Sequence, residues 1–382
     1  MLPLDGILVV GLEQAVAAPH CTRQLADLGA RVIKVESPAG DFTRTYDSAV
    51  AGTTSAHFAW CNRGKESVTL DLKSTAGREA VEQLLARADV LVQNLAPGAA
   101  ERMGLDARSA VARFPRLVAL DVSGYGHGGP RASARAYDLL IQAESGSCAV
   151  TGTDTAPVKP GIPLADIGTG MVAANAILAA LLSRATSGIG AAISVGMFDV
   201  VTDWMSWALH QARATGQDPA RVGLSSPMVA PYGAYRTSDD HVLVLGTTND
   251  SEWRRLATHV LGRPDLAEDA RYAHNPDRVA HREELDAIIV GWAAGQTFQA
   301  AADLAEAALL GWARYNTPLD VLEHPQLTSR DRWVPTAVAG GQFTSLRPPA
   351  ESEAWEWTPG AVPSAGEHTA AVLREFGCDI GA

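Results

Sequence analysis

The sequence of 382 residues has few charged side chains, since Asp, Glu, Lys and Arg together make up 19% of it. Acidic residues exceed basic ones by 43 to 31, which gives a formal net charge of −12 at pH 7. A general nucleic-acid-binding protein needs a basic face, so this balance excludes nucleic acid as a partner. The apolar fraction of 47% excludes disorder for most of the chain. Sparse charge also suggests that much surface is buried against another subunit.

Cysteine is scarce and scattered. The four residues are Cys21, Cys61, Cys148 and Cys378. They form no CxxC pair and have no histidine at ligand spacing, which excludes a zinc signature and a disulfide framework. The ten histidines form no HExxH or HxH pattern, so we assign no metal. Unpaired cysteines fit a reducing compartment, and we expect a cytoplasmic protein.

Targeting signals and long hydrophobic runs are also missing. Residues 1–11 place no basic region ahead of an apolar stretch, which is typical of a first strand and not of a signal peptide. The longest nearly apolar stretch, Met171–Leu182, is interrupted by Asn175 and is well short of the roughly 20 residues that a bilayer needs. We therefore expect a buried core helix there, and no membrane as a partner.

Short apolar runs alternate with helical stretches in the first half of the chain. A strand at 6–11, a helix at about 19–28 and a strand at 30–35 form a strand–helix–strand unit of about 30 residues. Further strands are predicted at 67–72, 89–93 and 117–123, and a further helix at 77–88. This alternation predicts an α/β fold with a Rossmann-like parallel sheet and helices on both faces.

The second half has a different pattern. A strand at 192–195 leads into one long helical stretch, 197–215, and a hairpin is predicted from 232–236 and 241–246. Helices follow between 251 and 308, and a last helix is predicted at 367–376. We place a second, smaller domain at 225–330.

The familiar phosphate-binding loops are absent from the sequence. There is no GxxxxGK[ST] motif and no GxGxxG after the first strand, so the Rossmann-like sheet does not imply NAD or ATP. No GxSxG motif is present either. Residues 123–130 are dense in glycine after a strand, which suits either close approach of backbone N–H groups to a ligand or a flexible turn.

One acid stands out from the rest. Asp166 lies between an apolar run and small residues, just before a helix expected at Met171–Arg184. Such an Asp is usually a helix cap. A helix N-terminus also lowers the pKa of a carboxylate and exposes N–H donors, and flanking glycines leave room for a substrate carbonyl. We therefore interpret Asp166 as a candidate covalent nucleophile.

Short motifs in a specific order make the chain similar to the family III CoA-transferases over residues 3–377. The main motifs are Leu25–Glu36, Asn62–Lys65, Asp89–Asn94, Asp166–Gly170 and Gly366–Thr369. The resemblance implies an interlocked homodimer. It also implies that 1–200 and 331–382 together form the large domain, which a connecting helix and linker at 201–224 join to the small inserted domain, 225–330.

The resemblance also implies a mechanism and a set of site residues. Asp166 would attack the thioester of an acyl-CoA and form a mixed aspartyl–acyl anhydride, so that CoA enters as a substrate thioester and not as a permanently bound cofactor. The residues assigned to CoA are Asn94, Arg102, Arg135, Tyr137, Lys65 and Arg44. The substrate-site candidates are Asp138, Gly168, Gly170 and His20. Candidate oxyanion donors are N–H groups at Gly168–Gly170 or in a facing glycine loop.

Three other interpretations remain. The α-methylacyl-CoA racemases share the fold but pair the Asp with a His where this chain has Tyr137, and they use a Glu that 246–250 lacks. A racemase needs two acid–base groups on opposite faces of a carbon, so transfer is favoured. Oxalate-specific members carry a run of four glycines that is absent from 225–233. An intact Asp166 counts against a catalytically silent CoA-binding protein.

The expected substrates come from three further stretches. Residues 243–253, 278–282 and 324–327 look closer to family members that act on C4–C5 dicarboxylates. We expect succinyl-CoA or a similar donor, and a small carboxylic acid such as itaconate, mesaconate, citramalate or malate as the acceptor.

Overall fold

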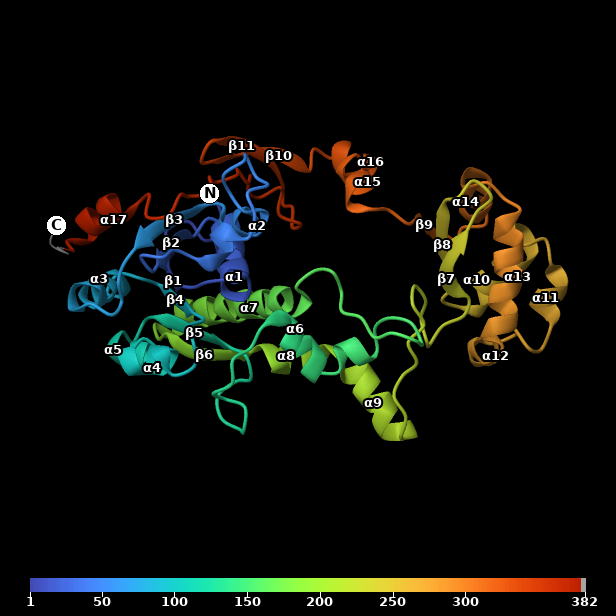
Figure 1. The fold of residues 1–382 in the computed structure, drawn as a ribbon, viewed down its shortest axis with the longest axis horizontal. Helices are drawn as coiled ribbons and strands as arrows, with labels where there is room; N and C mark the ends of the chain where they lie inside the picture. The colour runs from blue at the N-terminus through green and yellow to red at the C-terminus, as the bar shows by residue number, and fades with distance from the viewer. Residues whose placement is uncertain (379–382) are drawn as a thin grey trace. The chain divides into compact units, whose positions relative to one another are not determined.

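The computed structural model of the protein describes residues 1–378 and divides into two compact units (Figure 1). The large unit contains residues 1–147, 160–206 and those from 326 onward, and the small unit contains 148–159 and 207–325. The small unit therefore begins nearer the N-terminus than the expected residue 225, and it takes up a segment expected in the large domain. The hydrogen bonds of Arg221 account for this difference. Its guanidinium donates to the carbonyls of Ala149, Thr153 and Asp154, which holds that segment to the part of the small unit that contains Arg221.

The large unit is built on a six-stranded sheet in the order β3-β2-β1-β4-β5-β6. All its neighbouring strands are parallel, which confirms the expected parallel α/β fold. The strands are β1 (Leu8–Leu12), β2 (Arg31–Glu36), β3 (Lys65–Thr69), β4 (Val90–Gln93), β5 (Val118–Ser123) and β6 (Ala191–Gly196). The order of the strands reverses between β1 and β4, and ligands of such sheets bind in the crevice beyond the carboxyl ends of the strands at that point.

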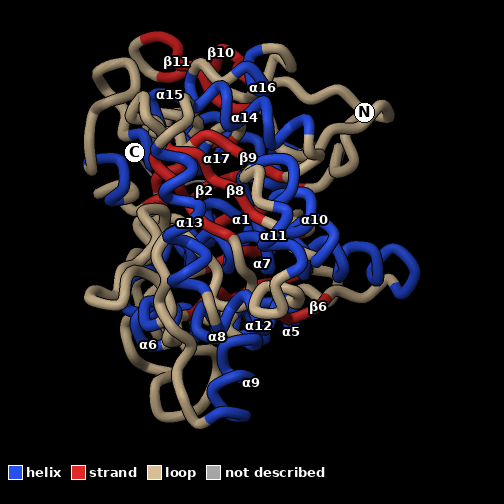
Figure 2. Tube along the Cα trace, turned by 90° about the vertical axis from the view of Figure 1, so that its right-hand side faces the viewer, coloured by secondary structure: helices blue, strands red, loops and turns tan. Residues whose placement is uncertain are grey.

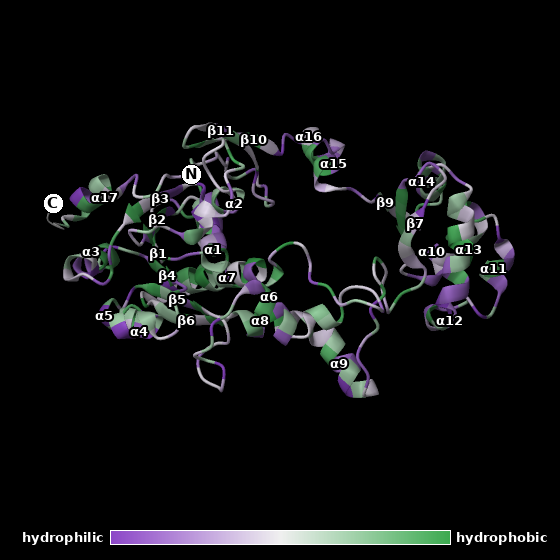
Figure 3. Cartoon of the chain, viewed as in Figure 1, coloured by the Kyte–Doolittle hydropathy of each residue, from purple (hydrophilic) through white to green (hydrophobic). Residues whose placement is uncertain are grey.

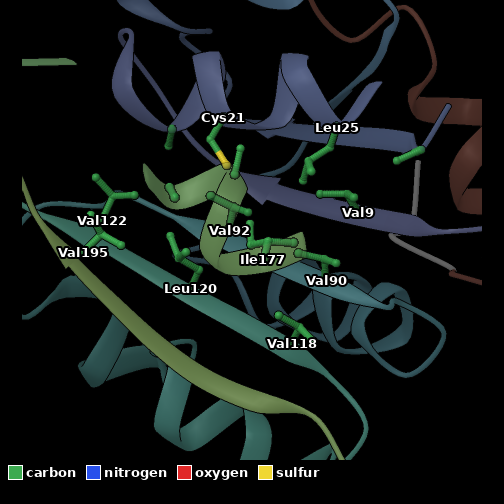
Figure 4. Close-up of a cluster of buried hydrophobic side chains, with 14 of the residues drawn as sticks. Val9, Cys21, Leu25, Val90, Val92, Val118, Leu120, Val122, Ile177 and Val195 are labelled. Carbon is green, nitrogen blue, oxygen red and sulfur yellow. The ribbon is translucent and has the colours of Figure 1, made fainter. Parts of the chain in front are cut away.

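Each face of the sheet has its own apolar core, because successive strand residues point to opposite faces. Val9 packs with Cys21 of α1 (Ala17–Asp27) and Ile177 of α7 (Leu164–Ser187) in one core, which Figure 4 shows. Val10 packs on the other face against α3 (Thr75–Leu85), α5 (Ala107–Arg113) and α17 (Thr369–Phe376). Each large aliphatic side chain that is fully buried in these cores stabilises the fold by about 1.5–3 kcal/mol.

Helix α7 begins earlier than the sequence predicts. It starts at Leu164 and not at Met171, so Asp166 lies in its first turn instead of preceding it. Its 24 residues are long and apolar enough to cross a membrane by length and composition alone, and Figure 3 colours much of it as hydrophobic. In the described structure one side of α7, which includes Ala173, Ile177 and Leu181, packs into the core that it shares with α1 and the sheet, whereas Met171 and Leu182 are exposed. The sequence therefore predicted a core helix correctly, but the predicted helix was shorter than α7.

Shorter elements complete the large unit. They are η1 (Phe42–Thr45), α2 (Ala56–Asn62), α4 (Ala99–Met103), α6 (Asp138–Glu144), α8 (Met197–Trp204), β10 (Trp333–Val338) and β11 (Gly341–Leu346), and η2 (Ser147–Ala149) lies where the chain passes to the small unit. Strands β10 and β11 form an antiparallel hairpin that the sequence did not predict. The expected single helix at 197–215 is broken at Met205 into α8 and α9 (Ser206–Thr215).

The small unit packs helices against a three-stranded sheet. The sheet consists of β7 (Tyr232–Arg236), β8 (Val242–Gly246) and β9 (Gly311–Arg314), and the antiparallel pair β7–β8 confirms the predicted hairpin. Figure 2 distinguishes its red strands from the blue helices. The helices are α10 (Asp250–Arg255), η3 (Leu256–Val260), α11 (Pro264–Glu268), α12 (Asn275–Ala280), α13 (Arg282–Ala294), α14 (Phe298–Ala307) and α15 (Pro318–Leu322). A short helix, α16 (Pro325–Thr328), follows where the chain returns to the large unit.

Candidate active site

The loop from β1 to α1 lies at the point where the strand order reverses, and Asn94 holds it there. The Oδ1 atom of Asn94 accepts from the N–H of Gln14 at 2.9 Å, and its Nδ2 atom donates to the carbonyl of Gln14 at 2.8 Å. Both polar atoms of the Asn94 side chain are thus engaged with the backbone of this loop. These two hydrogen bonds give Asn94 a part in shaping the site, and its contact with CoA stays a prediction.

The carboxylate of Asp166 faces the N-terminus of α1. The N–H of Ala17, the first residue of that helix, faces this carboxyl group and lowers its pKa. The preceding residue, Val16, provides no side-chain cap, so this N–H group at the helix start is available to the carboxylate. The positive end of the α1 dipole also favours a negative charge at this place. Two helices from distant parts of the sequence therefore meet at one carboxylate.

A second carboxylate holds the start of α7. Asp138, the first residue of α6, accepts the N–H of Ala165 at 2.9 Å and the Nε2 atom of Gln142 at 2.8 Å. Burial raises the pKa of Asp166 to about 7, the negative charge of Asp138 adds to this rise, and the N–H of Ala17 opposes it. Near neutral pH a substantial fraction of Asp166 is thus ionised. This ionised form is more basic than an ordinary aspartate, which suits a nucleophile.

The glycines after Asp166 serve packing. A Cβ atom on Gly168 would lie 2.1 Å from the ring of Trp204, and one on Gly170 would lie 2.7 Å from the carbonyl oxygen of Ala17. Both glycines are inside α7, where each N–H bonds to the carbonyl four residues earlier. This corrects the expectation that N–H groups at 168–170 serve as oxyanion donors. The N–H of Ala17 is the donor that the structure places at Asp166.

An aromatic row adjoins the site, and the sequence did not predict it. The row runs through Phe42, Tyr46, His57, Trp60 and His20. The distances between successive ring centroids are 5.9, 5.8, 6.1 and 5.5 Å. Burial raises the pKa of Tyr46, and the charges of Asp41 and Asp166 add to this rise. The row therefore supplies apolar surface near the carboxylate. The signal in the sequence was five aromatic or histidine rings within residues 42–60, and all of them except Phe58 belong to the row.

His20 lies at the buried end of this row. Burial lowers its pKa to about 3, and the positive charges of Arg23 and Lys65 add to the effect, so the imidazole is neutral at physiological pH. Its Nε2 atom lies 3.2 Å from a guanidinium nitrogen of Arg23. The structure thus places His20 in the packing between α1 and α7, next to Gly170. Tyr137, another predicted site residue, is 59% exposed directly before α6.

Two of the predicted CoA cations have structural partners. Lys65 is fully buried, with its Nζ atom 2.7 Å from a carboxylate oxygen of Glu13. Arg44 donates two hydrogen bonds, of 2.7 and 2.8 Å, to Glu36 and stacks on the ring of Phe58 at 3.6 Å. A buried, paired ammonium group cannot reach a phosphate, which corrects the assignment of Lys65. Arg44 is committed to Glu36 in the same way.

The other two cations remain accessible. Arg102 on α4 and Arg135 before α6 are exposed, and within residues 1–378 neither guanidinium has an ion pair or a side-chain hydrogen bond. Both can therefore meet an anionic ligand without breaking an existing contact. The same part of the chain contains no group of three His, Cys, Asp or Glu side chains that could hold a metal ion.

Comparisons with known proteins agree with this fold. The sequence profile described as CoA-transferase family III matches residues 4–369. The acetyl-CoA:oxalate CoA-transferase of Acetobacter aceti is 39% identical over 290 residues, which cover 75% of this chain and 74% of that protein. The succinyl-CoA:mesaconate CoA-transferase of Haloarcula hispanica is 33% identical over 392 residues, which cover 99% and 97% of the two proteins.

A solved structure extends the match to three dimensions. The crystal structure of a CaiB/BaiF family protein from Brucella suis is 36% identical, with a TM-score of 0.85, over 98% of this chain and 99% of that one. The agreement in sequence and in fold covers nearly the whole chain. The protein therefore belongs to CoA-transferase family III and is a CoA-transferase enzyme.

Proposed function

We propose that Asp166 carries the acyl group during CoA transfer. Its carboxylate oxygen attacks the thioester carbonyl of the donor, the carbon–sulfur bond breaks, and CoA leaves as a thiolate beside a mixed anhydride. The acceptor carboxylate then attacks the Asp166 carbonyl of this anhydride and displaces the donor acid. The thiolate attacks the acceptor carbonyl of the new anhydride, which forms the product thioester and restores the Asp166 carboxylate.

A carboxylate suits this exchange because an anhydride is about as activated as a thioester. No step then leaves the acyl group in a deep energy minimum, and one difficult displacement is divided into easier ones. When a nucleophile attacks the Asp166 carbonyl, negative charge develops on its oxygen. The N–H of Ala17 faces this carboxyl group and can stabilise that charge. The observation that carries the proposal is this pairing of a reactive carboxylate with a helix N-terminus.

The test is to trap the intermediate. The wild-type enzyme, incubated with succinyl-CoA and hydroxylamine, should release free CoA and convert Asp166 to a hydroxamate that peptide mass spectrometry detects. Asp166→Ala should retain its circular dichroism spectrum and lose both CoA transfer and trapping. Full transfer activity in folded Asp166→Ala would disprove the proposal. Exchange of a Cα proton of a 2-methylacyl-CoA with deuterated water, without acyl transfer, would favour the racemase alternative instead.

For the substrates, we propose succinyl-CoA or a similar donor and a small dicarboxylate acceptor. The acceptors named for similar proteins are dicarboxylates, namely oxalate, glutarate and mesaconate. Two of these three acceptors, glutarate and mesaconate, are C5 dicarboxylates, which supports a C4–C5 acceptor. A panel of itaconate, mesaconate, citramalate, malate, glutarate and oxalate, with new CoA esters followed by mass spectrometry, tests this. Transfer to oxalate alone would contradict it.

We also propose that the chain functions as an interlocked homodimer. Large apolar side chains are exposed in the single chain, including Leu182 at 74% and Ile189 at 65%. A monomeric protein rarely leaves so many large apolar residues in water. Light scattering should then give about twice the chain mass of 40.1 kDa. A mass equal to one chain would contradict the proposal.

A further inference from the structure

Four charged side chains are buried together beneath the loop from β1 to α1. They are Glu13, Lys34, Asp41 and Lys65, and each side chain is 0% exposed. A carboxylate oxygen of Glu13 lies 2.7 Å from the Nζ atom of Lys65 and 3.8 Å from that of Lys34, which in turn lies 2.9 Å from Asp41. Burying such charges costs several kcal/mol per ion, and apolar replacements are often as stable. Stability alone is therefore a weak reason for this cluster.

The two ammonium groups also fix the main chain on either side of Ala17. Lys34 donates to the carbonyl of Glu13 at 3.1 Å, and Lys65 donates to the carbonyl of Pro19 at 2.9 Å. Between these two anchored carbonyls lies Ala17, whose carbonyl oxygen packs against Gly170 of α7 and whose N–H faces the carboxylate of Asp166. The buried cluster is therefore connected to the site through a short segment of backbone.

Glu13 is the member of the cluster that contacts both lysines. Its second carboxylate oxygen accepts the hydroxyl hydrogen of Thr22, on α1, at 2.7 Å. The side chain folds back over β1, where a Cβ atom on Gly11 would lie 2.8 Å from the carboxyl carbon. Glu13, which follows β1, thus links Lys34 of β2 and Lys65 of β3 to Thr22 of α1.

We propose that Glu13 is a positioning residue, which acts through Lys34 and Lys65 to hold the N–H of Ala17 against Asp166. This inference rests on the proposed role of Asp166 in acyl transfer, and Glu13 itself contacts no substrate. Removing one oxyanion donor outright costs about 10²–10³-fold in rate in other enzymes. Loosening the loop that carries the donor should cost less, about tenfold in kcat, with little change in KM.

The test compares Glu13→Gln with a matched variant, Glu66→Gln. Glutamine keeps the shape of Glu13 and removes the charge that neutralises two buried lysines. Glu66 also loses one negative charge, but it lies on β3 in an ion pair with Arg31 near the surface, outside the cluster. We expect Glu13→Gln to lower kcat and the rate of hydroxylamine trapping about tenfold, with KM for acyl-CoA within twofold of wild type. Glu66→Gln should keep all three values within twofold.

A further measurement separates positioning from general destabilisation. Since the N–H of Ala17 lowers the pKa of Asp166, weakening that bond should move the midpoint of the pH profile of kcat/KM upward by about half a unit. If Glu13→Gln does not fold, Glu13→Gln/Lys65→Met restores the balance between one buried ammonium and one buried carboxylate. We expect the folded double variant to keep the lowered kcat, because the hydrogen bond from Lys65 to the carbonyl of Pro19 is lost.

Two outcomes would overturn the inference, and both differ from a failure of the proposed function. The first is wild-type kcat with an unshifted pH midpoint in folded Glu13→Gln, while the wild type still yields the Asp166 hydroxamate. The second is wild-type kcat in the folded double variant. If the wild type transfers CoA but yields no Asp166 hydroxamate, the proposed role of Asp166 is disproved instead.

Discussion

The N–H of Ala17, at the start of α1, faces the carboxylate of Asp166, in the first turn of α7. This N–H group stabilises the ionised carboxylate, whereas burial and the nearby Asp138 disfavour it. The balance of these effects sets both the reactivity of Asp166 and the stability of the fold around it. The predictions below use that balance, the packing of α7 and the two accessible cations.

The rate should depend on pH near neutrality. Only the ionised form of Asp166 attacks a thioester, and its pKa is raised to about 7, so kcat/KM should fall about tenfold per pH unit well below 7 and level off above 8. Kinetics between pH 5.5 and 8.5 test this. Asp138→Asn removes a charge that raises the pKa, so it should move the midpoint down. A profile that is flat down to pH 5.5 would indicate an unperturbed aspartate.

Asp166→Asn should stabilise the fold, most strongly above neutral pH. Because the pKa of Asp166 is higher in the folded chain than its ordinary 3.8, the stability from its protonated form is full below about pH 4 and is lost as pH rises through 7. Asparagine does not ionise. We therefore expect Asp166→Asn to have a higher melting temperature than wild type, by a difference that grows from pH 4 to 7. At pH 7 the difference in the free energy of unfolding should be about 2 kcal/mol, after allowance for the partial exposure of the site. Equal melting temperatures across this range would disprove the prediction.

Gly168→Ala should destabilise the large unit by about 1–3 kcal/mol, as overpacking typically does. The added methyl group would lie 2.1 Å from the ring of Trp204, at the end of α8, so the ring or the helix must shift. Gly161→Ala is the matched control, because a Cβ atom there meets nothing within 4 Å. Denaturant unfolding should show a clear loss for the first variant and a change within about 0.5 kcal/mol for the second. Equal losses would contradict the packing role of Gly168.

Arg102→Gln and Arg135→Gln should each raise KM for acyl-CoA by about 3–10-fold, with little change in kcat, if these accessible cations hold the CoA phosphates. This rise in KM should be smaller at high salt, because salt screens the attraction between exposed charges. Arg108→Gln, which removes another exposed arginine, on α5, serves as the control and should leave KM unchanged. Steady-state kinetics at 50 and 500 mM NaCl measure both effects. An equal rise of KM in all three variants would point to net charge alone.

Much of the fold follows from local sequence. Apolar runs such as that of β1 fit buried parallel strands, and the alternation with helices predicted the sheet. The hairpin β7–β8 was also predictable, because its turn residues separate two apolar runs. Asp166 itself stood out by its small neighbours. These features depend on periodicity and spacing within a few tens of residues, and such local patterns are visible in the sequence itself.

Other features depended on contacts between distant segments. Lys65 looked like a phosphate ligand, but Glu13, 52 residues away, holds it in the core. The first turn of α7 was missed because its capping carboxylate belongs to Asp138, on another helix. By itself the sequence determined the sheet and singled out Asp166. Only the tertiary structure decided which charges are buried in pairs and which N–H faces the carboxylate, since solvation and hydrogen bonding depend on neighbours that folding brings together.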